Sequence, residues 1–173
     1  MMTRLGALAT PSGRAWMTRG FGVATLTWLL TLVMVPFLLA HETQARAVTV
    51  ASAGTYLVGS LICHQRPDRS FRPWGVQMPV CTRCVGLYLG AAVGVVLAGA
   101  RKTRSSTGGE TARIGRPALR TMVLVAAVPT GVTWLGEVVG WLSVTGGVRA
   151  VAAVPLGVAV TWVASLVIRG ELA

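Results

Sequence analysis

The stretch FGVATLTWLLTLVMVPFLLA, residues 21–40, contains 20 residues and no charged side chain. At about 1.5 Å of rise per residue, a helix of this length is about 30 Å long, which matches the hydrocarbon core of a bilayer. The apolar residues fill the whole stretch instead of forming one stripe, as they would on the surface helix of a soluble domain. We therefore predict a membrane-spanning helix over residues 21–40.

Similar apolar blocks recur along the rest of the chain. Of the 173 residues 53% are hydrophobic and 12% are charged, and the mean hydropathy is +0.66, which is too apolar for an ordinary soluble domain. We predict an all-α, multi-pass transmembrane bundle of about five helices, formed by a single membrane domain over residues 21–170. A basic disordered tail (1–20) precedes it, further spans cover residues 43–62, 84–100, 121–142 and 148–168, and a polar loop covers residues 101–120.

Two local patterns indicate how the spans pack. Gly86, Gly90 and Gly94 recur at four-residue spacing, so they form a flat strip on one helix face where a neighbouring helix can approach closely. The linker SVTGG between the last two spans is short, which predicts an antiparallel hairpin.

The net charge of +11 comes from arginines at segment ends and in loops. Such residues anchor helices to anionic lipid headgroups. Because no nucleic-acid recognition motif accompanies the charge, we predict the lipid bilayer and its headgroups as partners, and not nucleic acid.

Reactive side chains are concentrated between the second and third spans, in CHQRPDRSFRPWGVQMPVCTRCVGLY, residues 63–88, here called the island. It holds all three cysteines of the chain, one of its two histidines and four of its arginines. Turn residues such as Asp68 and Ser70 can bond nearby backbone groups, and the chain is predicted to turn near Trp74 and Gly75. We expect an ordered cap.

Four metal-ligating side chains of the island can meet at one membrane surface. Cys81 and Cys84 form a C-x-x-C pair with Tyr88 one turn further on the same helix face, and Cys63 and His64 end the second span. Together the four ligands match a Cys₃His zinc site in number. A site of three cysteines, with His64 supporting a ligand, is the alternative within this hypothesis.

Two other hypotheses use the same atoms. A thiol oxidoreductase would use Cys81 and Cys84, with Cys63 as exchange partner, although the βαβ pattern of thioredoxins is missing. In the third hypothesis the cysteines are simply small buried hydrophobic residues. We take a zinc-binding protein with a structural or accessory role as the first hypothesis and an enzyme as less expected.

Charged residues in and near the spans are further candidates. Arg66, Arg69, Arg72 and Arg83 of the island can bind lipid phosphate or another anionic ligand, or simply anchor the protein to headgroups.

Glu137 is the only acidic residue inside a predicted span. We expect an arginine partner for it, Arg149 being the nearest in the hairpin, unless Glu137 reaches water at the helix end. A small transporter that uses Glu137 ranks after the zinc-binding protein and the thiol oxidoreductase as a candidate function.

The island resembles the signature of a prokaryotic family of small integral membrane proteins, catalogued as domain of unknown function 2085. The resemblance implies a multi-pass fold in the cytoplasmic (inner) membrane and supports the island as the site, but it implies no activity. Members carry an aspartate near Thr133; here Thr133 is neutral and Glu137 follows one turn later. The matching residues are Tyr56, Ser60, Cys63, His64, Gln65, Pro67, Arg69, Ser70, Phe71, Gly75, Gln77, Pro79, Cys81, Arg83, Cys84, Gly86, Tyr88, Gly90, Arg149 and Gly157.

The distribution of basic residues does not by itself determine the orientation of five spans in the membrane. With the tail outside, they divide equally, eight on each face of the membrane. If the four island arginines serve a site, the remaining eight against four favour an external tail and an external island.

Overall fold

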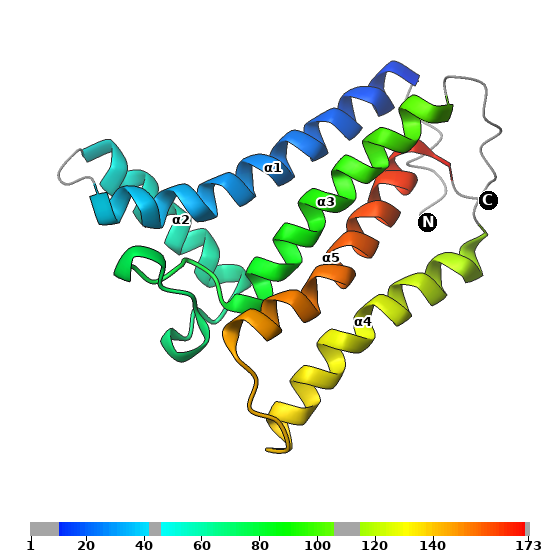
Figure 1. Ribbon diagram of the computed structural model, residues 1–173. Coiled ribbons are helices and arrows are strands. Elements are labelled where there is room, and N and C mark those ends of the chain that lie inside the picture. Colours follow the sequence, from blue (N-terminus) through cyan, green and yellow to red (C-terminus); the bar gives the residue numbers. More distant parts are fainter. Residues whose placement is uncertain (1–10, 42–45, 106–114, 172–173) are drawn as a thin grey trace.

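The computed structural model describes residues 11–41, 46–105 and 115–171, and within these ranges it contains five α-helices, two short 3₁₀ turns and no strand. The predicted all-α fold of about five helices is confirmed (Figure 1). The helices are α1 (Pro11–His41), α2 (Arg46–Ile62), α3 (Thr82–Ser105), α4 (Arg116–Val138) and α5 (Gly146–Arg169), and the 3₁₀ turns are η1 (Pro67–Arg69) and η2 (Pro73–Gly75).

Four of these helices, α1, α3, α4 and α5, are long and apolar enough to cross a membrane. The exception is α2, which has 17 residues and is therefore about 26 Å long. A full span was expected over residues 43–62; the helix covers Arg46–Ile62, and residues 42–45 lie outside the described part of the chain.

The first helix is longer than the expected span. It begins at Pro11, so residues 11–20 are helical where a disordered tail was expected, and residues 1–10 lie outside the described part. Proline is well tolerated in the first helical turn, and the Ala, Arg and Met that follow are good helix formers. The helix of the apolar span therefore extends toward the N-terminus.

The centre of the bundle is the pair α3 and α5, which pack backbone to backbone. A Cβ added to Gly86 would overlap the carbonyl oxygen of Ala150, and one added to Gly90 would overlap that of Val154. Both pairs are separated by 64 residues, so the two helices run in parallel, side by side (Figure 1). The predicted close approach along the glycine strip is confirmed.

The helix α4 packs against α5 in the opposite direction. The hydroxyl of Thr130 donates to the carbonyl of Ala152 at 2.8 Å, and further along α4 the side chain of Glu137 contacts Arg149. Because residue numbers rise on one helix as they fall on the other, the predicted antiparallel hairpin is confirmed.

The helix α1 is also antiparallel to α3. Trp28 lies edge-on to Tyr88 with ring centroids 6.0 Å apart, and a Cβ on Gly22 would lie 3.1 Å from Val95. The starts of α3 and α5 therefore share one end of the bundle with the C-terminal ends of α1 and α4, and the island lies at that end (Figure 1).

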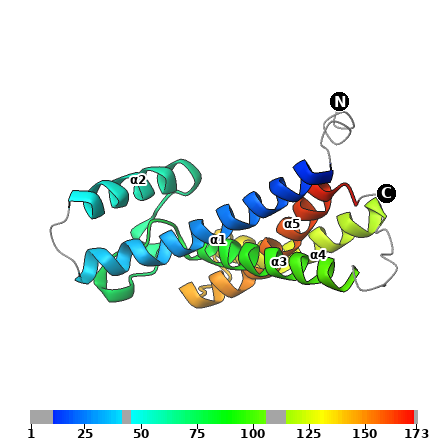
Figure 2. The same ribbon diagram turned by 90° about the horizontal axis from the view of Figure 1, so that it is seen from above.

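The short helix α2 stands apart from this bundle. It connects the C-terminal end of α1 with the island, and Figure 2 shows it set off from α3, α4 and α5 on the far side of α1. Its Gly59 lies against the backbone of Pro79, where an added Cβ would overlap the carbonyl oxygen. Thus α2 begins and ends at the island end of the bundle.

Candidate metal centre

The three cysteines of the chain meet where α2 ends and α3 begins. Cys63 follows the last residue of α2, Cys81 directly precedes α3, and Cys84 lies in its first turn. Their sulfur atoms all lie within 4.8 Å of one another, and those of Cys81 and Cys84 are 3.5 Å apart. The predicted convergence is confirmed for these three residues, and such a group can hold a metal ion.

His64 does not join this group among the residues that the structure describes. Its side chain is exposed, whereas Cys63, its neighbour, is buried with 6% of its surface accessible. The chain leaves the helix at this point, and two adjacent side chains there face different directions. The structure thus brings together three of the four predicted ligands.

Backbone groups hold the cluster in place. The amide of Cys63 bonds the carbonyl of Gly59 at 2.9 Å and so continues α2, while the carbonyl of Cys81 accepts from the amide of Val85 at 3.0 Å. The amide of Cys81 also donates to the sulfur of Cys63 at 3.2 Å. The backbone at the start of α3 therefore fixes the position of a sulfur atom that comes from the end of α2.

Cys81 lies at the start of a helix, where amide groups point toward its side chain. The hydrogen bond from Cys84 lowers the pKa of the Cys81 thiol to about 5; backbone amides of the first turn of α3 and the contact with Cys63 act in the same direction, against the effect of burial. The lowered pKa of Cys81 favours the thiolate, the form of cysteine that binds a metal ion or attacks a disulfide.

The cluster is enclosed by apolar side chains. Leu32, Met78 and Val80 are buried against it, and the rings of Trp28 and Tyr88 pack beside them. Tyr88, which was expected on the same face as the C-x-x-C pair, does pack against the cluster. This shell covers the buried Cys63, whereas Cys81 and Cys84 stay partly exposed.

Glutamine side chains fasten the island to α2. The amide of Gln65 donates to the carbonyls of Tyr56 and Pro79, both at 2.7 Å, and the amide of Gln77 donates to the carbonyl of Gln65 at 2.8 Å. The hydroxyl of Tyr56 donates to the carbonyl of Gln77. From the sequence, Gln65 and Gln77 were noted as residues that match the family signature, and no contact was predicted for either.

The rest of the island forms the ordered turn that the sequence indicates. Trp74 and Gly75 have φ angles of 54° and 79°, and the amide of Met78 donates to the carbonyl of Phe71 at 2.9 Å. The hydroxyl of Ser70 donates to the carbonyl of Arg66 at 2.9 Å. Met78 is buried in the cluster, so the turn also supplies part of its apolar wall.

A buried ion triad joins three helices beside the cluster. Glu137 of α4 accepts from Arg149 of α5 at 2.6 Å and from Arg83 of α3 at 2.8 Å. Only 7% of its side chain is exposed, so it does not reach water at the helix end. The predicted partner Arg149 is confirmed, whereas Arg83, 54 residues away, had been expected to bind lipid phosphate or another anion, or to contact headgroups.

Two other arginines of the island form exposed pairs with one carboxylate. Asp68 lies 3.3 Å from Arg66 and 3.6 Å from Arg69. Exposed pairs of this kind contribute about 0–1 kcal/mol each, so they do little for stability.

The fold and the cluster define a helical membrane protein with a group of three thiols at one end of its bundle. The family described as "Predicted membrane protein (DUF2085)" matches residues 63–163, more than half of the chain. The chain belongs to this family, and the resemblance inferred from the island is confirmed.

The relatives are archaeal and carry no assigned activity. An uncharacterized protein of Methanocaldococcus jannaschii is 36% identical over 75 residues, which cover 43% of this chain and 48% of that protein. An uncharacterized protein of Methanothermobacter thermautotrophicus is 57% identical over 30 residues, covering 17% of this chain and 27% of the relative. The matches thus span about half the length of the first relative and less of the second. No solved structure matches this chain.

Proposed function

We propose that Cys63, Cys81 and Cys84 bind one thiophilic metal ion, with zinc as the expected ion, and that the ion has a structural or accessory role in a membrane protein. The observation that carries this proposal is the group of three sulfur atoms within 4.8 Å of one another. Thiolates favour zinc and other soft ions over magnesium or calcium.

The spacing of the sulfur atoms fits such an ion. Zinc–sulfur bonds of about 2.3 Å in tetrahedral geometry separate two sulfurs by about 3.8 Å. The sulfurs of Cys81 and Cys84 are 3.5 Å apart, and no pair in the group exceeds 4.8 Å. The fourth position is left to a water molecule or another ligand.

The position of the cluster supports a structural role. The ion would link the end of α2 to the start of α3, next to the buried side chains of Leu32, Met78 and Val80.

A thiol oxidoreductase is the second candidate function, and the C-x-x-C pair at the start of α3 favours it. The Cys81 thiolate would attack a substrate disulfide and form a mixed disulfide. Cys84 or Cys63 would then displace the substrate, which leaves as a dithiol, while the protein keeps the disulfide.

The arrangement of the helices supports an external island. If α2 does not cross the membrane, the N-terminal segment, the segment that connects α3 and α4, and the end of α5 lie on one side of it. These segments contain ten of the sixteen basic residues. The other six belong to α2, the island and the start of α5. Basic residues concentrate on the cytoplasmic side, so the island faces outward in a prokaryotic inner membrane, with anionic headgroups around it.

Metal analysis of the purified full chain tests the first candidate. We expect one zinc ion per chain in the wild type and its loss in the variants Cys63→Ser and Cys81→Ser. Because His64 lies outside the sulfur group, the matched variant His64→Ala should keep the metal. Chelation should lower the thermal stability of the wild type but not that of Cys81→Ser.

A metal-free protein with a reducible bond between Cys81 and Cys84, detected by mass spectrometry after thiol alkylation, would overturn the metal site and support the oxidoreductase.

A further inference from the structure

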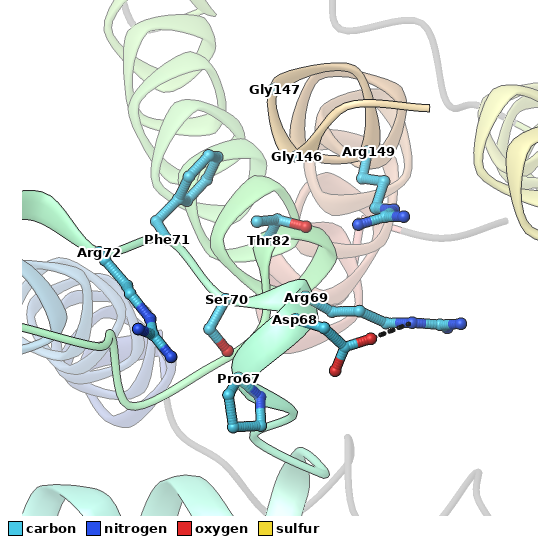
Figure 3. Close-up of a pocket in the computed structure, with 10 residues that line it drawn as sticks. All are labelled: Pro67, Asp68, Arg69, Ser70, Phe71, Arg72, Thr82, Gly146, Gly147 and Arg149. Carbon is cyan, nitrogen blue, oxygen red and sulfur yellow. Dashed lines mark ion pairs between the residues drawn. The ribbon is translucent and has the colours of Figure 1, made fainter. Parts of the chain in front are cut away.

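A cavity of about 360 Å³ opens beside the island, where residues 67–72 face the start of α5 (Figure 3). None of the cysteines lines it. Its volume lies in the range of small-molecule sites, which is about 300–1,000 Å³. The polar groups used below come from Arg69, Arg72, Thr82, Gly146, Gly147 and Arg149.

The charge of the lining favours an anion. Three arginines, Arg69, Arg72 and Arg149, line the cavity together with one carboxylate, that of Asp68. The carboxylate is already engaged by Arg69 and by Arg66, which lies outside the cavity. The lining therefore keeps a positive charge that an anion would neutralise.

Arg149 is held in position by Glu137. Its Nε donates to Glu137 at 2.6 Å, and Figure 3 shows the guanidinium group at the wall of the cavity. An arginine bound through Nε still has four N–H donors on its two terminal nitrogens, and these suit phosphate oxygens. The ion triad thus fixes the orientation of a binding group in advance.

Thr82 provides a buried polar group without a partner. Only 2% of its surface is exposed, and its hydroxyl forms no hydrogen bond within the described parts of the chain. In Figure 3 the hydroxyl points toward the guanidinium of Arg149, inside the cavity. A buried hydroxyl without a partner is unfavourable, and a bound oxyanion would supply the missing acceptor.

The start of α5 adds backbone donors. The first amides of a helix have no intrahelical acceptor, and the N-terminal end of the helix dipole attracts anions. Thr145 satisfies the amide of Val148, whereas Gly146 and Gly147 line the cavity. A side chain at Gly146 would meet Thr82 and Phe71 at 3.0 Å and 3.3 Å, so the glycine keeps this side of the cavity clear.

We propose that this cavity binds a phosphate group, recognised by Arg69, Arg72, Arg149 and the hydroxyl of Thr82. Phosphate oxygens match the donors of arginine and of a helix start, and the cavity leaves room for the ester that carries the phosphate. Two sources share this chemistry: an anionic phospholipid headgroup, or free phosphate and its soluble esters.

Calorimetric titration of the detergent-purified full chain tests the site with two probes. One is inorganic phosphate, against chloride at equal ionic strength; the other is short-chain phosphatidylglycerol, against phosphatidylcholine, whose choline cation the arginines repel. Binding of inorganic phosphate identifies a soluble anion as ligand, and binding of phosphatidylglycerol alone identifies a lipid headgroup. If neither binds, the proposal is wrong.

Variants separate ligand binding from folding. A hydrogen bond to a charged group is worth a factor of about 10–100 in affinity, so Thr82→Val should weaken binding at least about tenfold. Its thermal stability without ligand should not fall, because the hydroxyl has no partner among the described residues. Thr82→Ser keeps the hydroxyl and should keep binding.

The arginines have a matched control in the same loop. The double variant Arg69→Gln/Arg72→Gln should lose binding, and Arg66→Gln, outside the cavity, should retain it. Equal weakening in all of these variants, or full affinity in Thr82→Val, would overturn the proposal. The zinc content of each sample should not change, so this proposal and the metal site can fail independently.

Discussion

The carboxylate of Glu137 lies between two guanidinium groups, with 7% of its side chain exposed. Charges removed from water are costly, and a pair stabilises a fold only when its partners satisfy each other closely. Here one carboxylate bonds two arginines from two other helices, so the triad holds the start of α3, the end of α4 and the start of α5 together.

Replacement of Glu137 by glutamine should therefore destabilise the protein. Glu137→Gln leaves Arg83 and Arg149 as two buried cations without a counter-charge, and breaking a buried pair typically costs about 3–5 kcal/mol. Thermal and denaturant unfolding in detergent measures the loss. The control is Glu171→Gln at the exposed end of the chain. Equal stability of the two variants would contradict a structural role for the triad.

The sequence identified some of these residues and not their partners. Arg149 was predicted for Glu137 because a short linker brings the two helices together, whereas Arg83 comes from a helix whose register the sequence does not reveal. Thr82 received no role, because either middle residue of a C-x-x-C motif can be of any type. Its unpartnered hydroxyl is visible only in the folded chain.

Among the helices, the parallel pair α3 and α5 shows the tightest packing. Their contact needs residues without side chains, since a Cβ on Gly86 or Gly90 would overlap a carbonyl oxygen of α5. Apolar side chains gain little by leaving lipid, so close backbone contact is a main source of helix association in membranes.

Two alanine substitutions on α3 should have opposite effects. Gly90→Ala should destabilise the protein, since overpacking typically costs about 1–3 kcal/mol. Gly99→Ala has nothing within 4 Å of the new Cβ, and alanine is the better helix former, so stability should stay the same or rise. Unfolding in detergent measures both. Similar shifts in the two variants would show that the glycine strip does not hold α3 to α5.

The existence and order of the helices were predictable, because a long run of apolar residues with few charges is typical of a membrane-spanning helix. Their ends were not: the N-terminal helix begins ten residues before the predicted span, and the second helix is only 17 residues long. The second helix does end at residue 62 as predicted, next to the contacts of the island with Gly59 and Tyr56, but it begins three residues later than predicted.

Across the molecule, the number of crossings fixes which segments share a side of the membrane. Four crossings place both ends of the chain on one side and the island on the other, whereas five would place the two ends on opposite sides. The short α2 and the shared island end of α1 and α3 favour four. With four, the unequal distribution of basic residues favours a cytoplasmic position for both ends, as proposed above.

Tags at the two ends of the chain test this topology in intact cells and spheroplasts. We expect an N-terminal and a C-terminal epitope both to be protected from external protease, because both lie in the cytoplasm. An accessible N-terminal tag with a protected C-terminal tag would indicate five crossings, and two accessible tags would indicate four crossings in the opposite orientation. A soluble cytoplasmic protein that stays protected in the same samples serves as the control for cell integrity.

The four residues CTRC at the start of α3 face three different environments. Cys81 and Cys84 belong to the sulfur cluster, Thr82 lines the cavity, and Arg83 bonds Glu137, which in turn holds Arg149 at the cavity wall. A single helical turn thus links the proposed metal and phosphate sites. If an ion or a disulfide rotates that turn, the affinity for phosphate changes, and thermodynamic linkage requires bound phosphate to change the affinity of the cluster by the same factor.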